Sequence, residues 1–239
     1  MATTVMLNTN DGEMAAYDVE PTGRTRGAVV VLQEAYGVND HIESVARRFG
    51  EAGYRAVAPH LFHRSGDPAL DYGDLEKVMS HMQALSEQGL LDDIDASLRY
   101  LEEVGFGPAR IGVVGFCMGG SVTFLAASKR KLGAAVTFYG GGVVEGRFGM
   151  PPLLEMAPDL QTPWLGLFGE EDKGIPVDQV EAVRAAAQKA KVPTEVKLYP
   201  GAGHGFHCDA RPDSYHEASA KDAWEMTLRW FERYLAPAG

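Results

Sequence analysis

Short apolar runs alternate with segments of helical periodicity along most of the chain, and this alternation is the feature that most restricts the fold. Residues 27–32 read GAVVVL, a valine-rich run typical of a strand buried on both faces of a parallel sheet. Apolar residues with helical spacing follow at 42–49, and a second strand is expected at 54–58. This βαβ pattern predicts a mostly parallel central sheet with right-handed crossovers and helices on both faces, an α/β fold.

The rest of the chain continues the pattern. Residues 3–7 and 13–19 flank an Asn-Asp-Gly turn signal and predict an antiparallel hairpin at a sheet edge. Further strands are predicted at 110–114, 134–139, 164–168 and 195–199, and helices at 75–86, 91–104, 119–128 and 177–189, before a last helix with Trp224, Leu228, Phe231 and Leu235 on one face. The chain has 239 residues and no internal repeat, so one domain, 1–239, is expected.

Composition and charge exclude several classes of protein. With 45% hydrophobic residues the chain can bury a core, and its net charge of −11 argues against nucleic acid and anionic membranes as partners. No apolar run approaches the roughly 20 residues that span a bilayer, and residues 1–12 lack the features of a secretion signal. A cytoplasmic protein is therefore expected, with Cys117 and Cys208 as free thiols.

One segment has the pattern of a nucleophile loop. Residues 115–120 read GFCMGG, a G-x-C-x-G motif between a predicted strand and a predicted helix. Glycines on both sides of Cys117 permit a sharp, strained turn, and the helix N-terminus favours the thiolate. The alternative is a buried cysteine in a glycine-rich packing turn.

An acid and a base follow at the ends of two later strands. The 169–176 loop reads GEEDKGIP, and spacing alone cannot choose among Glu170, Glu171 and Asp172. After the next strand, PGAGHGF contains His204. Each residue alone is more often a helix cap or a loop histidine. Together, in the order nucleophile, acid, base, they predict catalysis at the carboxyl ends of the strands.

The chain from about residue 27 onward resembles the dienelactone hydrolase family of α/β-hydrolases. The resemblance rests on QEAYG at 33–37, GFCMGG at 115–120, GEED at 169–172 and GAGHGF at 201–206. It implies the α/β-hydrolase fold and the triad Cys117, His204 and Asp172. Residues 140–162 are short for a lid, so an open cleft and a small substrate are expected.

The resemblance also implies roles for the loop after residue 32. In the family, the residue at Glu34 contacts the resting thiol and moves as substrate binds, although from the sequence alone Glu34 would be a solvated loop acid. The amides of Ala35 and Met118 are expected to hold the oxyanion while Cys117 attacks a small ester or lactone and forms an acyl-thioester. His204 then activates water, with no metal and no cofactor.

The sequence departs from the family at its substrate clamp. Family members hold a substrate carboxylate with arginine and tyrosine side chains, and ungapped alignment places Leu75, Met79 and Cys208 near those positions. The clamp is therefore expected to be absent. Neutral short-chain esters or lactones are then expected to be processed with a kcat/KM at least comparable to that for dienelactone. Three other residues could supply polar groups in place of this clamp, although each is by default a surface residue: Arg64, His207 and Arg211.

Two other functions compete with hydrolysis. A metal-binding protein would use the nearby residues His204, His207, Cys208 and His216, although they lack the paired spacing of a structural zinc site. A thiol-sensing domain would use Cys117 without turnover. The remaining histidines are expected to be structural or solvated: His41, His60, His63 and His81. The sequence does not determine the oligomeric state.

Overall fold

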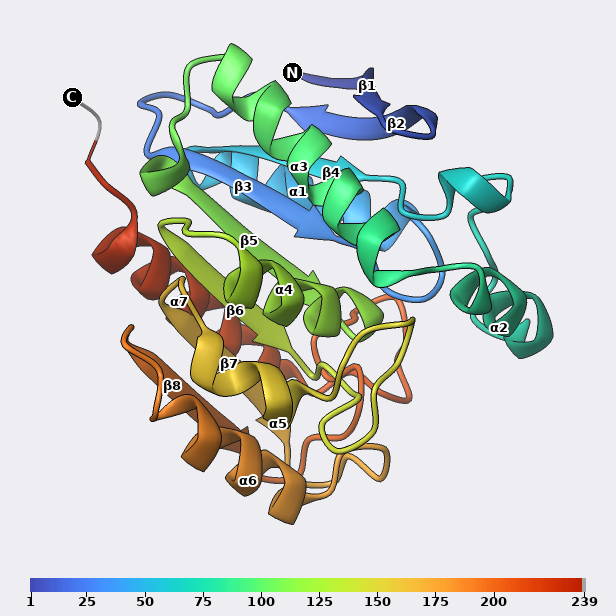
Figure 1. The fold of residues 1–239 in the computed structure, drawn as a ribbon, viewed down its shortest axis with the longest axis vertical. Helices are drawn as coiled ribbons and strands as arrows, with labels where there is room; N and C mark the ends of the chain where they lie inside the picture. Colours follow the sequence, from blue (N-terminus) through green and yellow to red (C-terminus); the bar gives the residue numbers. More distant parts are fainter. Residues whose placement is uncertain (238–239) are drawn as a thin grey trace.

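The computed structural model describes residues 1–237, without the side chain of Leu75, and contains one eight-stranded sheet in the order β1-β2-β4-β3-β5-β6-β7-β8 (Figure 1). The strands are β1 (Ala2–Thr9), β2 (Gly12–Val19), β3 (Gly27–Leu32), β4 (Tyr54–Pro59), β5 (Ile111–Phe116), β6 (Ala134–Phe138), β7 (Trp164–Gly169) and β8 (Thr194–Tyr199). The strands from β4 to β8 in this order are parallel, whereas β1 and β2 form an antiparallel hairpin, and β2 pairs antiparallel with β4. The predicted mostly parallel sheet and its edge hairpin are confirmed.

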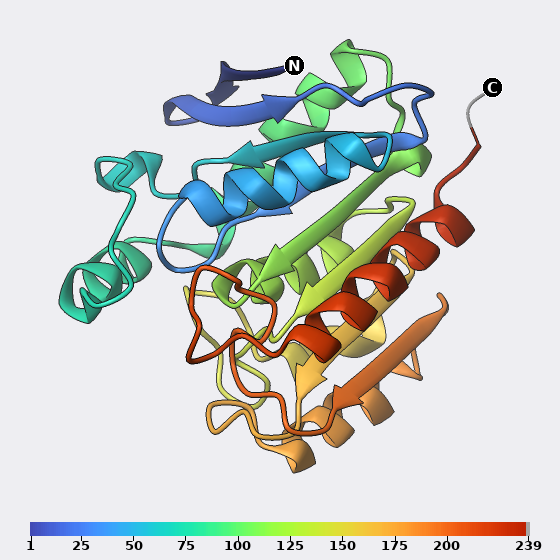
Figure 2. The ribbon, with the colours of Figure 1, turned by 180° about the vertical axis from the view of Figure 1, so that it is seen from behind.

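Helices cover both faces of the sheet. They are α1 (Asp40–Glu51), α2 (Leu75–Gln83), α3 (Glu87–Glu103), α4 (Met118–Lys129), α5 (Leu153–Met156), α6 (Val177–Ala187) and α7 (Glu217–Tyr234). Helices α3, α4, α5 and α6 lie on the face seen in Figure 1, and α1 and α7 lie on the face seen in Figure 2. Helix α2 projects beyond the main body at the end of the sheet where the parallel strands terminate (Figure 1).

Burial explains why the central strands have continuous apolar runs. Every residue of β3, β5, β6 and β7 is buried, because helices cover both faces there. In α1, the side chains with helical spacing, Ile42, Val45 and Phe49, are fully buried. The α1 N-terminus is capped by Asn39, whose Oδ1 accepts from the Ile42 amide at 3.2 Å.

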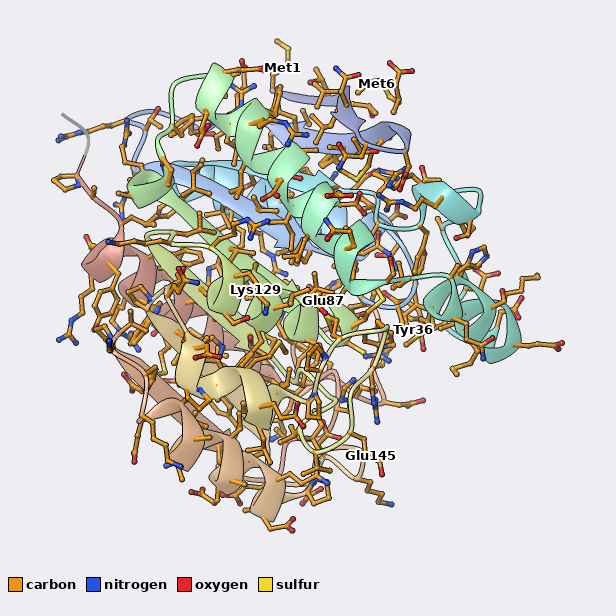
Figure 3. All side chains as sticks on the ribbon, viewed as in Figure 1. Met1, Met6, Tyr36, Glu87, Lys129 and Glu145 are labelled. Carbon is orange, nitrogen blue, oxygen red and sulfur yellow. The ribbon has the colours of Figure 1, made fainter. Side chains whose placement is uncertain are left out.

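Several boundaries differ from the sequence prediction. Helix α3 begins at Glu87 rather than at residue 91, because Ser86 caps it by accepting from the Gly89 amide at 3.2 Å. Strand β5 begins at Ile111 because Pro108–Arg110 form a 3₁₀ turn, and it continues to Phe116. An ion pair of 3.8 Å between Glu87 of α3 and Lys129 of α4 joins two helices on the same face (Figure 3).

The segment between β6 and β7 contains little helix. The four-residue α5 and the 3₁₀ turn Ala157–Asp159 are its helical elements within the described chain, in agreement with the absence of a long lid helix. Across residues 1–237, no helix has both the length and the apolar character needed to cross a membrane.

Candidate active site

Cys117 occupies a strained turn between β5 and α4. Its φ of 54° and ψ of −114° lie in a region that non-glycine residues rarely adopt. The flanking glycines are sterically required: a Cβ at Gly115 would lie 2.0 Å from the Gly119 carbonyl oxygen, and one at Gly119 would lie 2.3 Å from the Leu32 carbonyl oxygen. Only glycines allow the three chain segments to approach this closely, so the half-buried thiol is held at the helix N-terminus.

The structure brings the three sequence-predicted triad residues together. His204 Nδ1 lies 2.7 Å from Asp172 Oδ2, and Cys117 is close enough for its negative charge to raise the pKa of His204. The other oxygen of Asp172 accepts from the Gly174 amide at 2.8 Å, which fixes the carboxylate. The Asp172 side chain is 1% exposed and that of His204 is 36% exposed, so the acid is buried while the base reaches the surface.

The structure also distinguishes Asp172 from the two adjacent glutamates. Glu170 and Glu171 are exposed, whereas Asp172 points inward. The Glu171 amide donates to the Ala202 carbonyl at 2.9 Å, which holds the acid loop against the histidine loop. This contact between loops is invisible to spacing along the sequence.

His204 has an unusually high proton affinity. Its burial disfavours the charged imidazolium, but negative charge on Cys117 and the hydrogen bond to Asp172 outweigh that effect and raise the pKa of His204 to about 10. The imidazole is therefore protonated at neutral pH in the resting site, where it can donate a proton.

Two backbone amides are suited to stabilise an oxyanion. The amides of Ala35 and Met118 donate no hydrogen bond to any acceptor within residues 1–237. Met118 is the first residue of α4, where the helix dipole adds positive potential. The Gly119 amide donates to the Gln33 carbonyl at 3.0 Å and so joins the Ala35 loop to the nucleophile turn.

Glu34 is not a solvated loop acid, and that interpretation of the sequence is wrong. Its side chain is 1% exposed. Its Oε1 accepts from the Tyr139 hydroxyl at 3.3 Å and lies 3.7 Å from Arg211 Nη2, while Oε2 has no hydrogen-bond partner among the described residues. In the part of the chain that the structure describes, its polar contacts are thus to Tyr139 and Arg211 rather than to the Cys117 thiol.

Arg211 is not the surface residue that the sequence predicts by default, although the sequence names it among the side chains that could supply polarity to the site. Its side chain is only 19% exposed, and its guanidinium lies over the rings of Tyr36 and Tyr72, at 5.8 and 5.3 Å from their centroids. Burial opposes its charge, but the Glu34 carboxylate raises the pKa of Arg211 above its already high value. No local motif marks it.

His207 is not at the surface as the sequence predicts, and Arg64 is held by two acidic side chains. His207 is buried and stacks on Phe116 and Phe138, with ring centroids 5.1 and 4.9 Å away. Burial lowers its pKa far below the usual range, so it is neutral. Arg64 pairs with Asp11 at 2.6 Å and Asp93 at 2.8 Å.

Of the three positions assigned to the missing clamp, Met79 is half exposed and Cys208 is fully buried. The side chain of Leu75 lies outside the described residues. The expectation that apolar side chains replace the clamp therefore stays a prediction.

The histidines and Cys208 proposed as a metal site do not gather as the sequence suggested. His204 joins Asp172, His207 packs in the aromatic core, and His216 caps α7 by accepting from Ser219. Three other histidines pair with polar side chains: His60 with Asp67, His63 with Asp93 and His81 with Ser65. Within residues 1–237, the one group of three potential ligand atoms lying within 4.8 Å of one another is Glu34, His41 and Cys208.

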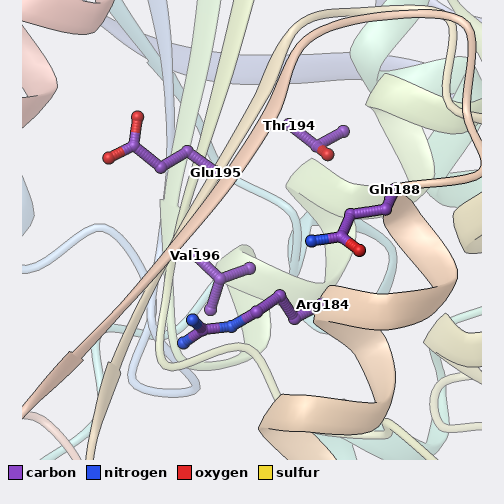
Figure 4. A pocket seen from close by; sticks show the side chains of 5 residues that line it. All are labelled: Arg184, Gln188, Thr194, Glu195 and Val196. Carbon is purple, nitrogen blue, oxygen red and sulfur yellow. The ribbon is translucent and has the colours of Figure 1, made fainter.

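A groove of about 840 Å³ reaches the triad at Asp172 and His204 and is lined by the acid loop, the histidine loop, residues 213–216 and Arg147, with Cys117 outside its lining. A second hollow, of about 190 Å³, lies between α6 and the start of β8 (Figure 4). It is lined by Arg184, Gln188, Thr194, Glu195 and Val196. The first groove is the candidate substrate site, because it reaches His204 and Asp172 at the carboxyl ends of the strands, whereas the second hollow lies at the amino end of β8.

Comparisons with known proteins group the chain with the dienelactone hydrolases. The model of the dienelactone hydrolase family matches residues 14–235. A "Putative carboxymethylenebutenolidase" of Salmonella typhimurium is 40% identical over 95% of this chain and 85% of its own. A "Probable 2-oxo-3-(5-oxofuran-2-ylidene)propanoate lactonase" of Bradyrhizobium is 32% identical over 97% of this chain and 94% of its own. The crystal structure titled "Putative Dienelactone Hydrolase" from Klebsiella pneumoniae superposes with a TM-score of 0.87 at 38% identity, covering 98% of this chain and 99% of the other.

Proposed function

The chain belongs to the dienelactone hydrolase family and is an ester or lactone hydrolase, and from this premise we propose that it acts through a thioester formed on Cys117. The observation that carries the proposal is the convergence of Asp172, His204 and Cys117 at the ends of β7, β8 and β5, with Asp172 hydrogen-bonded to His204 and the charge of Cys117 acting on the imidazole. The substrate is a small carboxylic ester or lactone that enters the groove beside His204.

In the acylation step, Cys117 Sγ attacks the substrate carbonyl carbon and forms a C–S bond. The carbonyl oxygen becomes an oxyanion that accepts from the amides of Ala35 and Met118. Collapse of this intermediate breaks the C–O bond of the ester, and the His204 imidazolium gives its proton to the departing alkoxide. In a lactone the alcohol stays attached to the acyl group.

Deacylation uses the change in charge that acylation produces. The thioester carries no charge on Cys117, so the main influence that raises the pKa of His204 is removed. The neutral imidazole can then take a proton from water while the hydroxyl oxygen attacks the thioester carbon. Collapse of the second intermediate breaks the C–S bond, releases the carboxylic acid and restores the thiolate beside a protonated His204.

The environment of Arg211 bears on the choice of substrate. Its guanidinium already faces Glu34 at 3.7 Å, so a carboxylate on the substrate has to compete with a buried carboxylate. Neutral esters and lactones meet no such competition. We expect kcat/KM for a neutral lactone to be at least equal to that for a matched lactone bearing a carboxylate. A strong, salt-sensitive preference for the anion would show that Arg211 is free to bind it.

The thioester is tested by mass spectrometry after rapid acid quenching with an activated aryl ester. The expected result is an acyl adduct on the peptide that contains Cys117, absent in Cys117→Ala and retained in Cys208→Ala. Turnover by Cys117→Ala at the wild-type rate would overturn the mechanism. Labelling of Cys117 by thiol reagents without any ester turnover would favour a thiol sensor instead.

A further inference from the structure

Glu34, His41 and Cys208 converge from three separate elements. Glu34 follows β3, His41 lies in the first turn of α1, and Cys208 lies in the loop after β8, yet one ligand atom from each falls within 4.8 Å of the others. Their side chains are buried, and two of their polar atoms, Glu34 Oε2 and His41 Nε2, have no hydrogen-bond partner in the part of the chain that the structure describes. We propose that these three side chains bind a divalent transition-metal ion of the zinc class.

The histidine is oriented as a metal ligand requires. Its Nδ1 lies 3.0 Å from Asp209 Oδ1, and the side chain of His41 itself is 0% exposed. A proton held on Nδ1 by this carboxylate leaves the lone pair on Nε2, the nitrogen without a partner. A carboxylate behind a histidine is the usual support of a histidine bound to zinc.

Cys208 is oriented by its own series of hydrogen bonds. Asn39 Oδ1 caps α1, so its amide nitrogen is the atom that faces Tyr72 and donates to the hydroxyl oxygen at 3.2 Å. The Tyr72 hydroxyl is then free to donate to Cys208 Sγ at 3.5 Å. Burial and the Glu34 carboxylate raise the pKa of this thiol, so the tyrosine donor and the metal ion together have to stabilise the thiolate, the form that binds metal.

The donor set selects the class of ion. One sulfur, one nitrogen and one carboxylate oxygen suit zinc, whereas magnesium and calcium prefer oxygen ligands alone. In tetrahedral zinc sites the ligand atoms lie roughly 3.4–3.7 Å apart, so these side chains need to draw together by about 1 Å. Binding replaces the proton of the Cys208 thiol, which is released to solvent.

Arg211 competes with the metal ion for the Glu34 carboxylate and the Cys208 sulfur. Its guanidinium lies 3.7 Å from Glu34 Oε1, and its pKa is raised by the Glu34 and Cys208 charges, so a positive charge already faces two of the three ligands. A metal ion has to displace it. Removal of the Arg211 charge is therefore expected to tighten metal binding, an effect opposite to that of removing a ligand.

Metal binding is expected to inhibit hydrolysis, a consequence that rests on the proposed function. Glu34 directly precedes Ala35, whose amide is the proposed oxyanion donor. An ion that draws Glu34 towards His41 and Cys208 also moves that amide away from the position set by Gln33 and Gly119. Zinc then lowers kcat, and a chelator restores it.

The site is tested by titrating metal-free protein with Zn²⁺ in competition with a chromogenic chelator, and with Co²⁺ to detect the absorption of a cobalt–thiolate bond. We expect one equivalent to bind wild type and Cys117→Ala equally well. Cys208→Ser is expected to lose the cobalt–thiolate absorption, and Asp209→Asn, at a half-exposed position, to weaken binding about 10- to 100-fold. Arg211→Met is expected to bind more tightly than wild type.

The Cys117 and Cys208 variants show whether the ion binds at the triad or at the group of Glu34, His41 and Cys208. Binding that disappears in Cys117→Ala and survives in Cys208→Ser would overturn the proposal and assign the ion to the triad. Unchanged affinity in Asp209→Asn would overturn it as well. Because the readout is binding, the metal site is judged independently of hydrolysis: a Cys117→Ala variant that still hydrolyses esters contradicts the proposed mechanism and leaves this result intact.

Discussion

The molecule contains two groups made of the same three side-chain types. Cys117 lies with His204 and Asp172, and Cys208 lies near His41, which pairs with Asp209. Cys117 sits in a left-handed turn at the start of α4, half-buried and near His204, whose pKa its charge raises.

Cys208 differs in its backbone and its access to solvent. It is fully buried in a turn, its amide donates to the Gly205 carbonyl at 2.9 Å, and burial together with the Glu34 charge raises its pKa. Residue type therefore does not determine which thiol reacts. The backbone turn, the free amides and the access to a groove distinguish the two groups.

The largest expected difference between the two groups is in turnover. Cys117→Ala should lower kcat/KM for an aryl ester by about 10³-fold or more, because the covalent step is lost. Cys208→Ala should stay within about threefold of wild type, since it removes no group that contacts the substrate in the proposed mechanism. Steady-state kinetics of the two variants under identical conditions checks this, and comparable losses in both would remove the distinction.

The next expected effect concerns the backbone of the nucleophile turn. Gly119→Ala should destabilise the fold by about 1–3 kcal/mol and abolish most activity, because its Cβ would lie 2.3 Å from the Leu32 carbonyl oxygen. Gly107→Ala is the matched control, since a Cβ there meets nothing within 4 Å. Urea unfolding of both variants measures the difference. Equal stabilities would show that the turn tolerates a side chain.

Thiol modification should separate the two cysteines by rate. Iodoacetamide is expected to modify Cys117 on the order of tenfold faster than Cys208 or more, because Cys208 is buried and its pKa is raised. Peptide mapping over time gives both rates, and activity should fall in parallel with modification of Cys117. Inactivation that instead follows modification of Cys208 would reverse the assignment.

The smallest expected effect is on stability as a function of pH. The folded pKa of His204, about 10, lies above its unfolded value near 6.5, so its stabilising contribution is complete below pH 6.5 and is lost progressively as the pH rises towards 10. The unfolding free energy of wild type should thus fall more steeply over this window than that of His204→Gln. Equal slopes by urea titration would mean that His204 is not protonated in the resting site.

Much of the fold and the triad could be predicted because their signals are local. The G-x-C-x-G motif and the loops after 168 and 199 each place one residue at a strand end, and the parallel sheet brings those ends together. The pairing of Glu34 with Arg211 joins residues from opposite ends of the chain and has no sequence pattern. The group of Glu34, His41 and Cys208 was missed for the same reason, and the helix boundary at Glu87 was missed because capping by Ser86 outweighed apolar periodicity.

The hydrogen bond from Gly119 to Gln33 has a consequence for how the protein acquires activity. Strands β3 and β5 pair with Leu32 opposite Gly115, so the two loops that carry the free amides meet only in that register. This pairing links segments about 80 residues apart, the kind of contact that forms slowly during folding. A chain with secondary structure but a displaced β5 would have Cys117 without its oxyanion donors. Recovery of ester hydrolysis during refolding therefore reports when β3 and β5 pair in their native register.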